Sequence, residues 1–299
     1  MAVLPLQNRC DPFPNRLGVP GFFSRQRWRS IGCTLSILAT LPFALAAASA
    51  QEGEPVGDEV HEREELGVNP YTAPSIARVF ERLDALKPLP FEQLRRAAPP
   101  KPGADRAEKA LIFGQLIGDG FLIVVAERKN QVEEFGRVLL RQARALGVAE
   151  RVTRHSASLT DLGRRGDWPA VRKELTATQA DVEQALVELR DQTIAHLISL
   201  GGWLRGLEIG TDAVAANFSA ERAKILSEPD LVDYFVEELK TLPPAIAHRA
   251  LIERIRAGLR AIQTLVRGAA GELSRDDVQA IRAQARELNS AIRELPGTS

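Results

Sequence analysis

Three ionisable residues lie inside apolar runs of the sequence, where a helix that is buried in a protein core normally has no charge. Asp119 lies inside an apolar run at 110–126 (ALIFGQLIGDGFLIVVA). His196 and Arg205 lie in a second apolar, glycine-rich run at 195–210 (AHLISLGGWLRGLEIG). A charged group in such surroundings must be paired, protonated or turned toward a cavity. The two runs therefore hold the side chains best placed to do chemistry.

These residues predict a polar site in a helical core, with an aromatic ring as one wall. The candidate ligand-binding residues are Asp119, Glu127, His196, Trp203, Arg205 and Glu208. The other interpretation is a buried Asp–His or Asp–Arg pair that fixes the register of two helices. The sequence favours this second interpretation, because charge pairs in helical cores are commonly structural.

Motifs for known catalytic and nucleotide chemistry do not occur in the sequence. It contains no GxGxxG, GxxxxGK[ST], GxSxG or HExxH segment, and no Glu precedes a His by three residues. The two cysteines, Cys10 and Cys33, both lie in the first fifty residues. We therefore expect no catalytic residues, no metal site and no cofactor.

The first fifty residues have the pattern of a cleaved signal peptide. Arg25, Arg27 and Arg29 precede an apolar run at 31–47, and the small residues Ala-Ser-Ala follow at 48–50. The pattern predicts export to the periplasm or the medium, with Gln51 as the first mature residue. Residues 51–74 are acidic and interrupted by proline, which predicts a disordered linker.

Composition narrows the class of protein further. The chain has 299 residues, of which 44% are hydrophobic, 26% charged and 5% aromatic, and this is a globular composition. Five Arg and one Asp lie in residues 1–50, so the remainder has a formal charge of −4. A mildly acidic chain is a poor partner for nucleic acid. We also expect no membrane contact after cleavage.

Helical spacing continues almost throughout the rest of the chain, and no strand is predicted. Expected helices follow the 3.6-residue period at 105–146, 149–163, 168–207, 212–226, 228–241, 244–268 and 275–294. The residues of one helix follow a 4-3 repeat typical of a coiled-coil seam: Val171, Leu175, Thr178, Val182, Ala185 and Leu189. The predicted fold is all-α, an elongated antiparallel bundle with long coiled-coil-like helices. It would form one domain over 75–299, with a C-terminal hairpin at 244–294.

Ridges of small residues predict how the two apolar runs meet. One ridge lies at 110, 114 and 118, and the other at 195, 199, 202, 206 and 210. Small residues let helix backbones approach closely. With antiparallel packing, Asp119 would lie level with His196 and Gly114 with Gly201. Asp119 would then accept a hydrogen bond from His196 or pair with Arg205.

The function expected from these features is non-catalytic. The leading hypothesis is an exported interaction, scaffold or sensor module of the cell envelope, with an envelope protein or a second copy as partner. One alternative is a bundle, enzymatic or not, that binds a small molecule or metal around Asp119 and His196. The second alternative is a membrane-associated hairpin through 110–126 and 195–210.

Overall fold

The computed structural model describes residues 75–97, 99, 102–188 and 191–294. The predicted signal peptide (1–50) and acidic linker (51–74) lie outside these residues. Contacts divide the chain into two units, 1–53 and 54–299, and only the second contains described residues.

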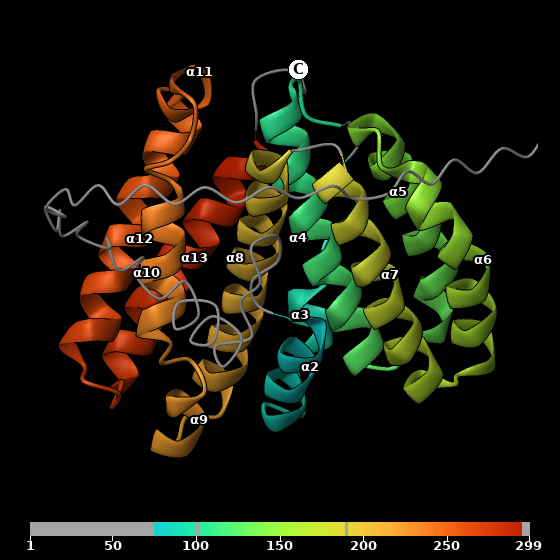
Figure 1. The fold of residues 1–299 in the computed structure, drawn as a ribbon. Helices are drawn as coiled ribbons and strands as arrows, with labels where there is room; N and C mark the ends of the chain where they lie inside the picture. Colours follow the sequence, from blue (N-terminus) through green and yellow to red (C-terminus); the bar gives the residue numbers. More distant parts are fainter. Residues whose placement is uncertain (1–74, 98, 100–101, 189–190, 295–299) are drawn as a thin grey trace, which may run out of the picture. The chain divides into compact units, whose positions relative to one another are not determined.

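The described residues form helices and no strands, which confirms the predicted all-α class (Figure 1). The helices are α2 (Ile76–Ala85), α3 (Phe91–Leu94), α4 (Arg106–Val125), α5 (Lys129–Leu146), α6 (Ala149–Arg165), α7 (Trp168–Glu188), α8 (Gln192–Ala216), α9 (Ala220–Lys224), α10 (Pro229–Glu238), α11 (Pro244–Ala247), α12 (Ala250–Gly268) and α13 (Arg275–Arg293). None of them is long and apolar enough to cross a membrane.

The predicted long helix at 105–146 is wrong, because the chain reverses between α4 and α5. Glu127 adopts a left-handed conformation with φ of 56°. The amide of Arg128 donates to the carbonyl of Ile123 (3.0 Å), and that of Glu127 to the carbonyl of Val124 (3.2 Å). This is the pattern that closes a helix C-terminus, where glycine usually stands. The sequence has no glycine, proline or asparagine at this point, so the end was not visible.

The predicted helix at 168–207 also divides, into α7 and α8. Because α6 is also a full helix that packs against both α5 and α7, the chain reverses four times between α4 and α8, so these two helices are parallel. The sequence predicted antiparallel packing. Positions in contact rise together along both helices: Leu111 with Gly201, Gly114 with Gly202, and Gly118 with Arg205. Asp119 is therefore level with Arg205, and the predicted register that placed it beside His196 is wrong.

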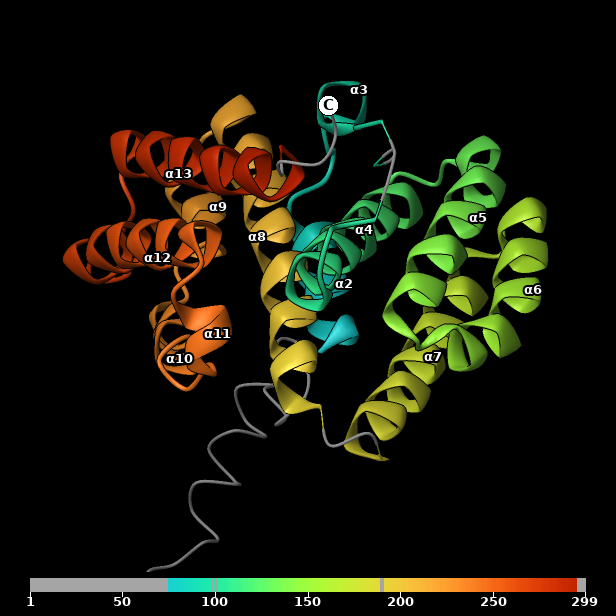
Figure 2. The same ribbon diagram turned by 90° about the horizontal axis from the view of Figure 1, so that it is seen from above.

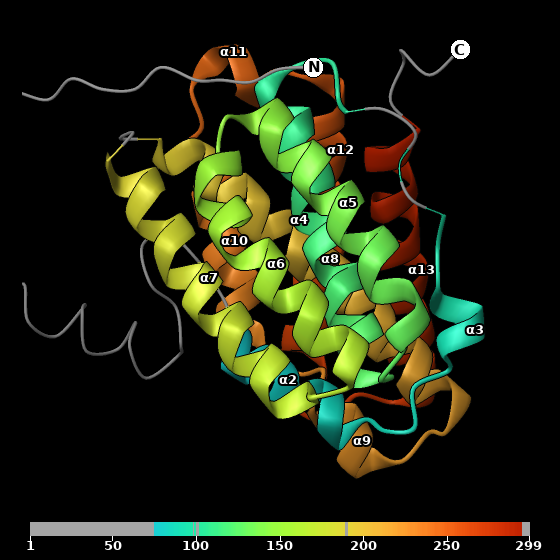
Figure 3. The ribbon, with the colours of Figure 1, turned by 90° about the vertical axis from the view of Figure 1, so that its right-hand side faces the viewer.

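The helices pack around the central α4–α8 pair. Helices α5, α6 and α7 lie together on one side of it, and α10, α12 and α13 lie on the other (Figure 2). Viewed from the α5–α7 side, these three helices run side by side in front of the central pair (Figure 3). Helix α7 packs extensively on α6 but only sparsely on α4 and α8.

Close backbone packing joins α4 to α8 at one point. A Cβ atom added to Gly114 would overlap the carbonyl oxygen of Ile198, and one added to Gly201 would overlap that of Leu111. The tight crossing predicted from the small residues is thus present. Only part of the predicted ridge on α8 takes part in this crossing, because no atom lies within 4 Å of a Cβ added to Gly206.

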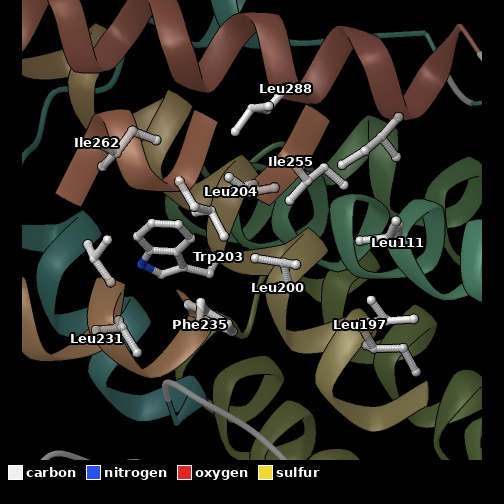
Figure 4. Close-up of a cluster of buried hydrophobic side chains, with 14 of the residues drawn as sticks. Leu111, Leu197, Leu200, Trp203, Leu204, Leu231, Phe235, Ile255, Ile262 and Leu288 are labelled. Carbon is white, nitrogen blue, oxygen red and sulfur yellow. The ribbon is translucent and has the colours of Figure 1, made fainter. Parts of the chain in front are cut away.

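A well-packed core fills the other side of the central pair. Helices α12 and α13 pack along each other, and Ile255, Ile262 and Leu288 have no exposed surface. Trp203 of α8 lies against Phe235 of α10, with ring centroids 5.0 Å apart (Figure 4). This core packs against one face of α8 and so positions the residues on its opposite face.

Candidate functional site

Asp119 lies at the centre of a four-residue charged cluster. Its Oδ1 accepts a hydrogen bond from Arg205 Nε (2.7 Å), and its Oδ2 accepts one from Arg96 Nη2 (3.0 Å). Glu208 Oε2 lies 2.8 Å from Arg205 Nη1 and 3.7 Å from Arg96 Nη1. Two arginines and two carboxylates therefore balance each other, and we call these four residues the Asp119 cluster.

The surrounding helices shield most of the Asp119 cluster from solvent. The Arg205 side chain is 1% exposed, and those of Asp119 and Glu208 are 16% and 13% exposed. The space beside Asp119 has no room for a water molecule. Arg205 Nη2 also donates to the carbonyl oxygen of Leu94, which attaches α3 to the central pair. The cluster therefore has the geometry of a buried structural ion pair.

The pKa values of Arg96 and Arg205 are shifted in opposite directions within the cluster. Burial lowers the pKa of Arg96, and its attraction to Asp119 does not compensate. Burial also acts to lower the pKa of Arg205, but the charges and hydrogen bonds of Asp119 and Glu208 outweigh it and raise that pKa. Arginine side chains are not deprotonated in folded proteins, so both guanidinium groups keep their charge.

Three of the predicted site residues lie elsewhere. Glu127 is exposed at the turn between α4 and α5. Trp203 is buried against Phe235. His196 Nδ1 lies 2.7 Å from Glu238 Oε2 and 3.2 Å from Tyr234 Oη, both on α10. His196 and Arg205 are about two and a half turns apart on α8, so they occupy opposite faces of it.

The structure brings together Asp119, Arg205 and Glu208 and adds Arg96, which the sequence analysis missed. Arg96 follows the short helix α3 in a proline-rich stretch, and nothing in its local pattern indicates a buried contact. Among the described residues, no group of three His, Cys, Asp or Glu side chains could hold a metal ion.

A separate feature of the described residues is an apolar cavity of about 250 Å³. It lies where α7 packs sparsely on the central pair, and helices α2, α4, α5 and α6 complete its walls. The wall residues on the α5–α7 side are Val132, Phe135, Gly136, Leu139, Val152, Ser156, Leu159, Thr160, Val171, Leu175, Thr178 and Val182. We call this space the apolar cavity.

Residues of the predicted coiled-coil seam form part of this wall. Val171, Leu175, Thr178 and Val182 share one face of α7, as their spacing predicted, but that face borders the apolar cavity. Coiled-coil packing is not confirmed. The difference arises from where α7 lies relative to α8, which the periodicity of one helix does not determine.

Small residues of α8 enlarge the apolar cavity. Gly202, Gly206 and Gly210 line it, and at Gly206 an added Cβ would enter open space. A glycine inside a helix costs about 1 kcal/mol relative to alanine. No close backbone contact requires glycine at position 206, in contrast to position 114. Its effect in the structure is to widen the cavity.

The cavity walls offer few partners to water. Thr160 and Thr178 line it, but their hydroxyl groups donate to the carbonyls of Ser156 (2.8 Å) and Glu174 (2.7 Å) in their own helices. Water enters a cavity when it finds several polar partners there. The site therefore favours an apolar occupant.

No protein-family model, no curated protein and no solved structure matches this chain. The fold and the two sites thus define the class from their own geometry: an all-α protein with a largely buried charged cluster and an apolar cavity.

Proposed function

We propose that this chain is a non-catalytic binding protein that holds one small apolar molecule in the apolar cavity. The cavity itself carries the proposal. It has a volume of about 250 Å³ and its walls are mainly apolar. An apolar occupant would be removed from water there, so the hydrophobic effect supplies the free energy of binding.

The non-catalytic part of the proposal rests on the charged residues. The Asp119 cluster compensates its own charges and has no adjoining space for a substrate. The polar site first expected around Asp119 and His196 is not assembled, so the small-molecule alternative moves to the apolar cavity. Export, inferred from residues 25–50, would make the protein a carrier or sensor module of the cell envelope, acting with an envelope partner or a second copy.

Binding of 1-decanol to the full-length chain tests the proposal by isothermal titration calorimetry. We expect saturable binding of one molecule per chain. Gly206→Leu should abolish it, because the new side chain occupies the cavity. Gly268→Leu is the matched control, since its Cβ also meets open space but lies outside the cavity lining. Gly136→Leu, on the opposite wall, provides a second cavity variant, and circular dichroism checks that each variant folds.

Failure of the wild-type protein to bind decanol would contradict the proposal. Wild-type affinity in both Gly206→Leu and Gly136→Leu would contradict it as well.

A further inference from the structure

Few arginines in the part of the chain that the structure describes lack a partner for the guanidinium group. Most contact a carboxylate, a backbone carbonyl oxygen or an aromatic ring. Within the described residues, no hydrogen bond, ion pair or ring contact is formed by the guanidinium groups of four: Arg137, Arg141, Arg144 and Arg260. Three of these four belong to α5.

The three arginines of α5 lie on one face of the helix. They are spaced by four and three residues, and side chains at that spacing are neighbours on a helix surface. All three are exposed, and α5 lies at the surface of the bundle (Figure 3). Like charges at this spacing repel each other, so a negatively charged partner would relieve the repulsion. We call Arg137, Arg141 and Arg144 the α5 stripe.

Neighbouring groups of the fold do not neutralise the α5 stripe. Glu133 precedes it on α5, but Glu133 pairs with Arg164 of α6 (2.5 Å). Among the described residues, neither Glu134 nor Glu150 forms an ion pair with the stripe. The negative end of the helix dipole acts only over the last turn, and Arg137 lies nine residues before α5 ends. The stripe therefore presents uncompensated positive charge.

The same chain carries a segment of opposite charge. Residues 54–65 (EPVGDEVHEREE) contain six carboxylates and one arginine. Opposite charges attract, and the attraction is strongest at low salt. Because the segment is joined to the bundle, its effective concentration at the bundle surface is in the millimolar range, so even weak contacts are populated.

The segment is long enough to reach the α5 stripe. It ends ten residues before Ser75, where the described residues begin. An extended chain covers up to about 3.3 Å per residue, so ten residues reach about 33 Å and the start of the segment reaches further. A domain of about 220 residues has a radius of gyration of about 17 Å. The surface of the bundle is therefore within reach of the segment.

We propose that the α5 stripe is the docking site of the acidic segment 54–65 of the same chain. The guanidinium groups of the stripe donate charge-assisted hydrogen bonds to the carboxylates of the segment. One exposed ion pair is weak, but several pairs on a tethered segment act together. This inference does not depend on the apolar cavity, so it stands or falls separately from the proposed function.

Backbone amide chemical shifts of the isotope-labelled full-length chain test the proposal at low salt. A triple variant, Arg137→Gln with Arg141→Gln and Arg144→Gln, should shift the amide signals of residues 54–65. In return, changing the six carboxylates of the segment to their amides should shift the signals of residues 137–144. Arg260→Gln is the matched control, because it removes the other arginine without a partner, on α12, and it should leave the segment unchanged. Both effects should disappear at about 1 M salt, where the Debye length is about 3 Å.

Three results would overturn the proposal. The first is a segment whose signals are the same in wild type and the triple variant. The second is a shift that grows with protein concentration, because the segment would then dock on a second copy of the chain. The third is a stripe that ignores the segment but responds to added vesicles of phosphatidylglycerol, which would assign it to an anionic lipid surface. Reciprocal shifts that do not depend on protein concentration support the proposal.

Discussion

Arg205 is the one cation that is fully buried among the described residues, and its environment explains why the fold tolerates it. Asp119, Glu208 and the carbonyl of Leu94 accept from its donors or neutralise its charge. Burying an arginine without such partners would cost several kcal/mol. At the residue scale, the unusual charge in the apolar run at 110–126 is therefore a structural element that joins α3, α4 and α8.

Asp119→Ala should lower the free energy of unfolding by about 3–5 kcal/mol, because Arg205 stays buried without its closest counter-charge. Urea denaturation measures the change. Glu287→Ala is the control, since it breaks an exposed pair with Arg254 and should cost less than about 1 kcal/mol. If Asp119→Ala stays within 1 kcal/mol of wild type, Asp119 is accessible to water and the structural interpretation is wrong.

Helix ends determined how much of the fold the sequence could predict. Where a capping residue is present, the predicted boundary is close to the observed one: Ser274 and Asp277 form a capping box at the start of α13. Where the chain turns through Glu127 with a positive φ, no residue type marks the end. With this end, the missed break between α7 and α8 and the turns on either side of α6, the chain reverses four times, so α8 runs parallel to α4 and not antiparallel as expected.

Side-chain pattern could not distinguish a packed helix face from one that borders a cavity. Val171 and Leu175 have the apolar character and the spacing of core residues in the sequence. A packed helix face and a cavity wall both favour apolar side chains, so this pattern does not separate the two. The pairing of Asp119 with Arg205 could be predicted, because both are isolated charges in apolar runs. Arg96 and the apolar cavity depend on how distant segments meet, which local spacing does not encode.

Two glycines of the predicted ridges should behave in opposite ways. Gly114→Ala should destabilise the protein by about 2–3 kcal/mol, because the added methyl group meets the backbone of α8. Gly206→Ala should stabilise it by up to about 1 kcal/mol, since alanine favours the helix and space is open there. Thermal unfolding of both variants measures this. Destabilisation by Gly206→Ala would show that the wall of the cavity is closed at that point.

The contact between α6 and α7 should depend on pH through His155. Its Nδ1 lies 2.8 Å from Glu174 Oε1 and its Nε2 lies 3.2 Å from Asp181 Oδ2, while Arg154 also pairs with Asp181. Burial acts to lower the pKa of His155, but the two carboxylates outweigh it and raise the pKa above its ordinary value of 6.5.

Because the folded-state pKa is the higher one, protonated His155 stabilises the fold below the unfolded pKa, and this stabilisation is lost as pH rises through the folded pKa. Hydrogen exchange of α6 and α7 should therefore be slower at pH 6 than at pH 8.5, after correction for the intrinsic rate. His155→Gln should remove the difference. An equal pH dependence in this variant would exclude His155 as its cause.

At the scale of the whole molecule, the two sides of the α4–α8 pair differ in packing. The side formed by α10, α12 and α13 is filled by residues such as Ile255 and Ile262 (Figure 4). The side formed by α5, α6 and α7 borders the apolar cavity. The proposed ligand binding depends on this difference, because one side fixes α8 in place and the other leaves space beside it.

The location of a bound ligand tests this account most directly. Intermolecular nuclear Overhauser effects can be recorded between unlabelled decanol and methyl-labelled Ile, Leu and Val side chains of the full-length protein. We predict contacts with Val132, Leu139, Leu175 and Val182, and none with Ile255 or Ile262. Contacts to the α12–α13 side, or to exposed methyl groups alone, would contradict the assignment of the apolar cavity as the binding site.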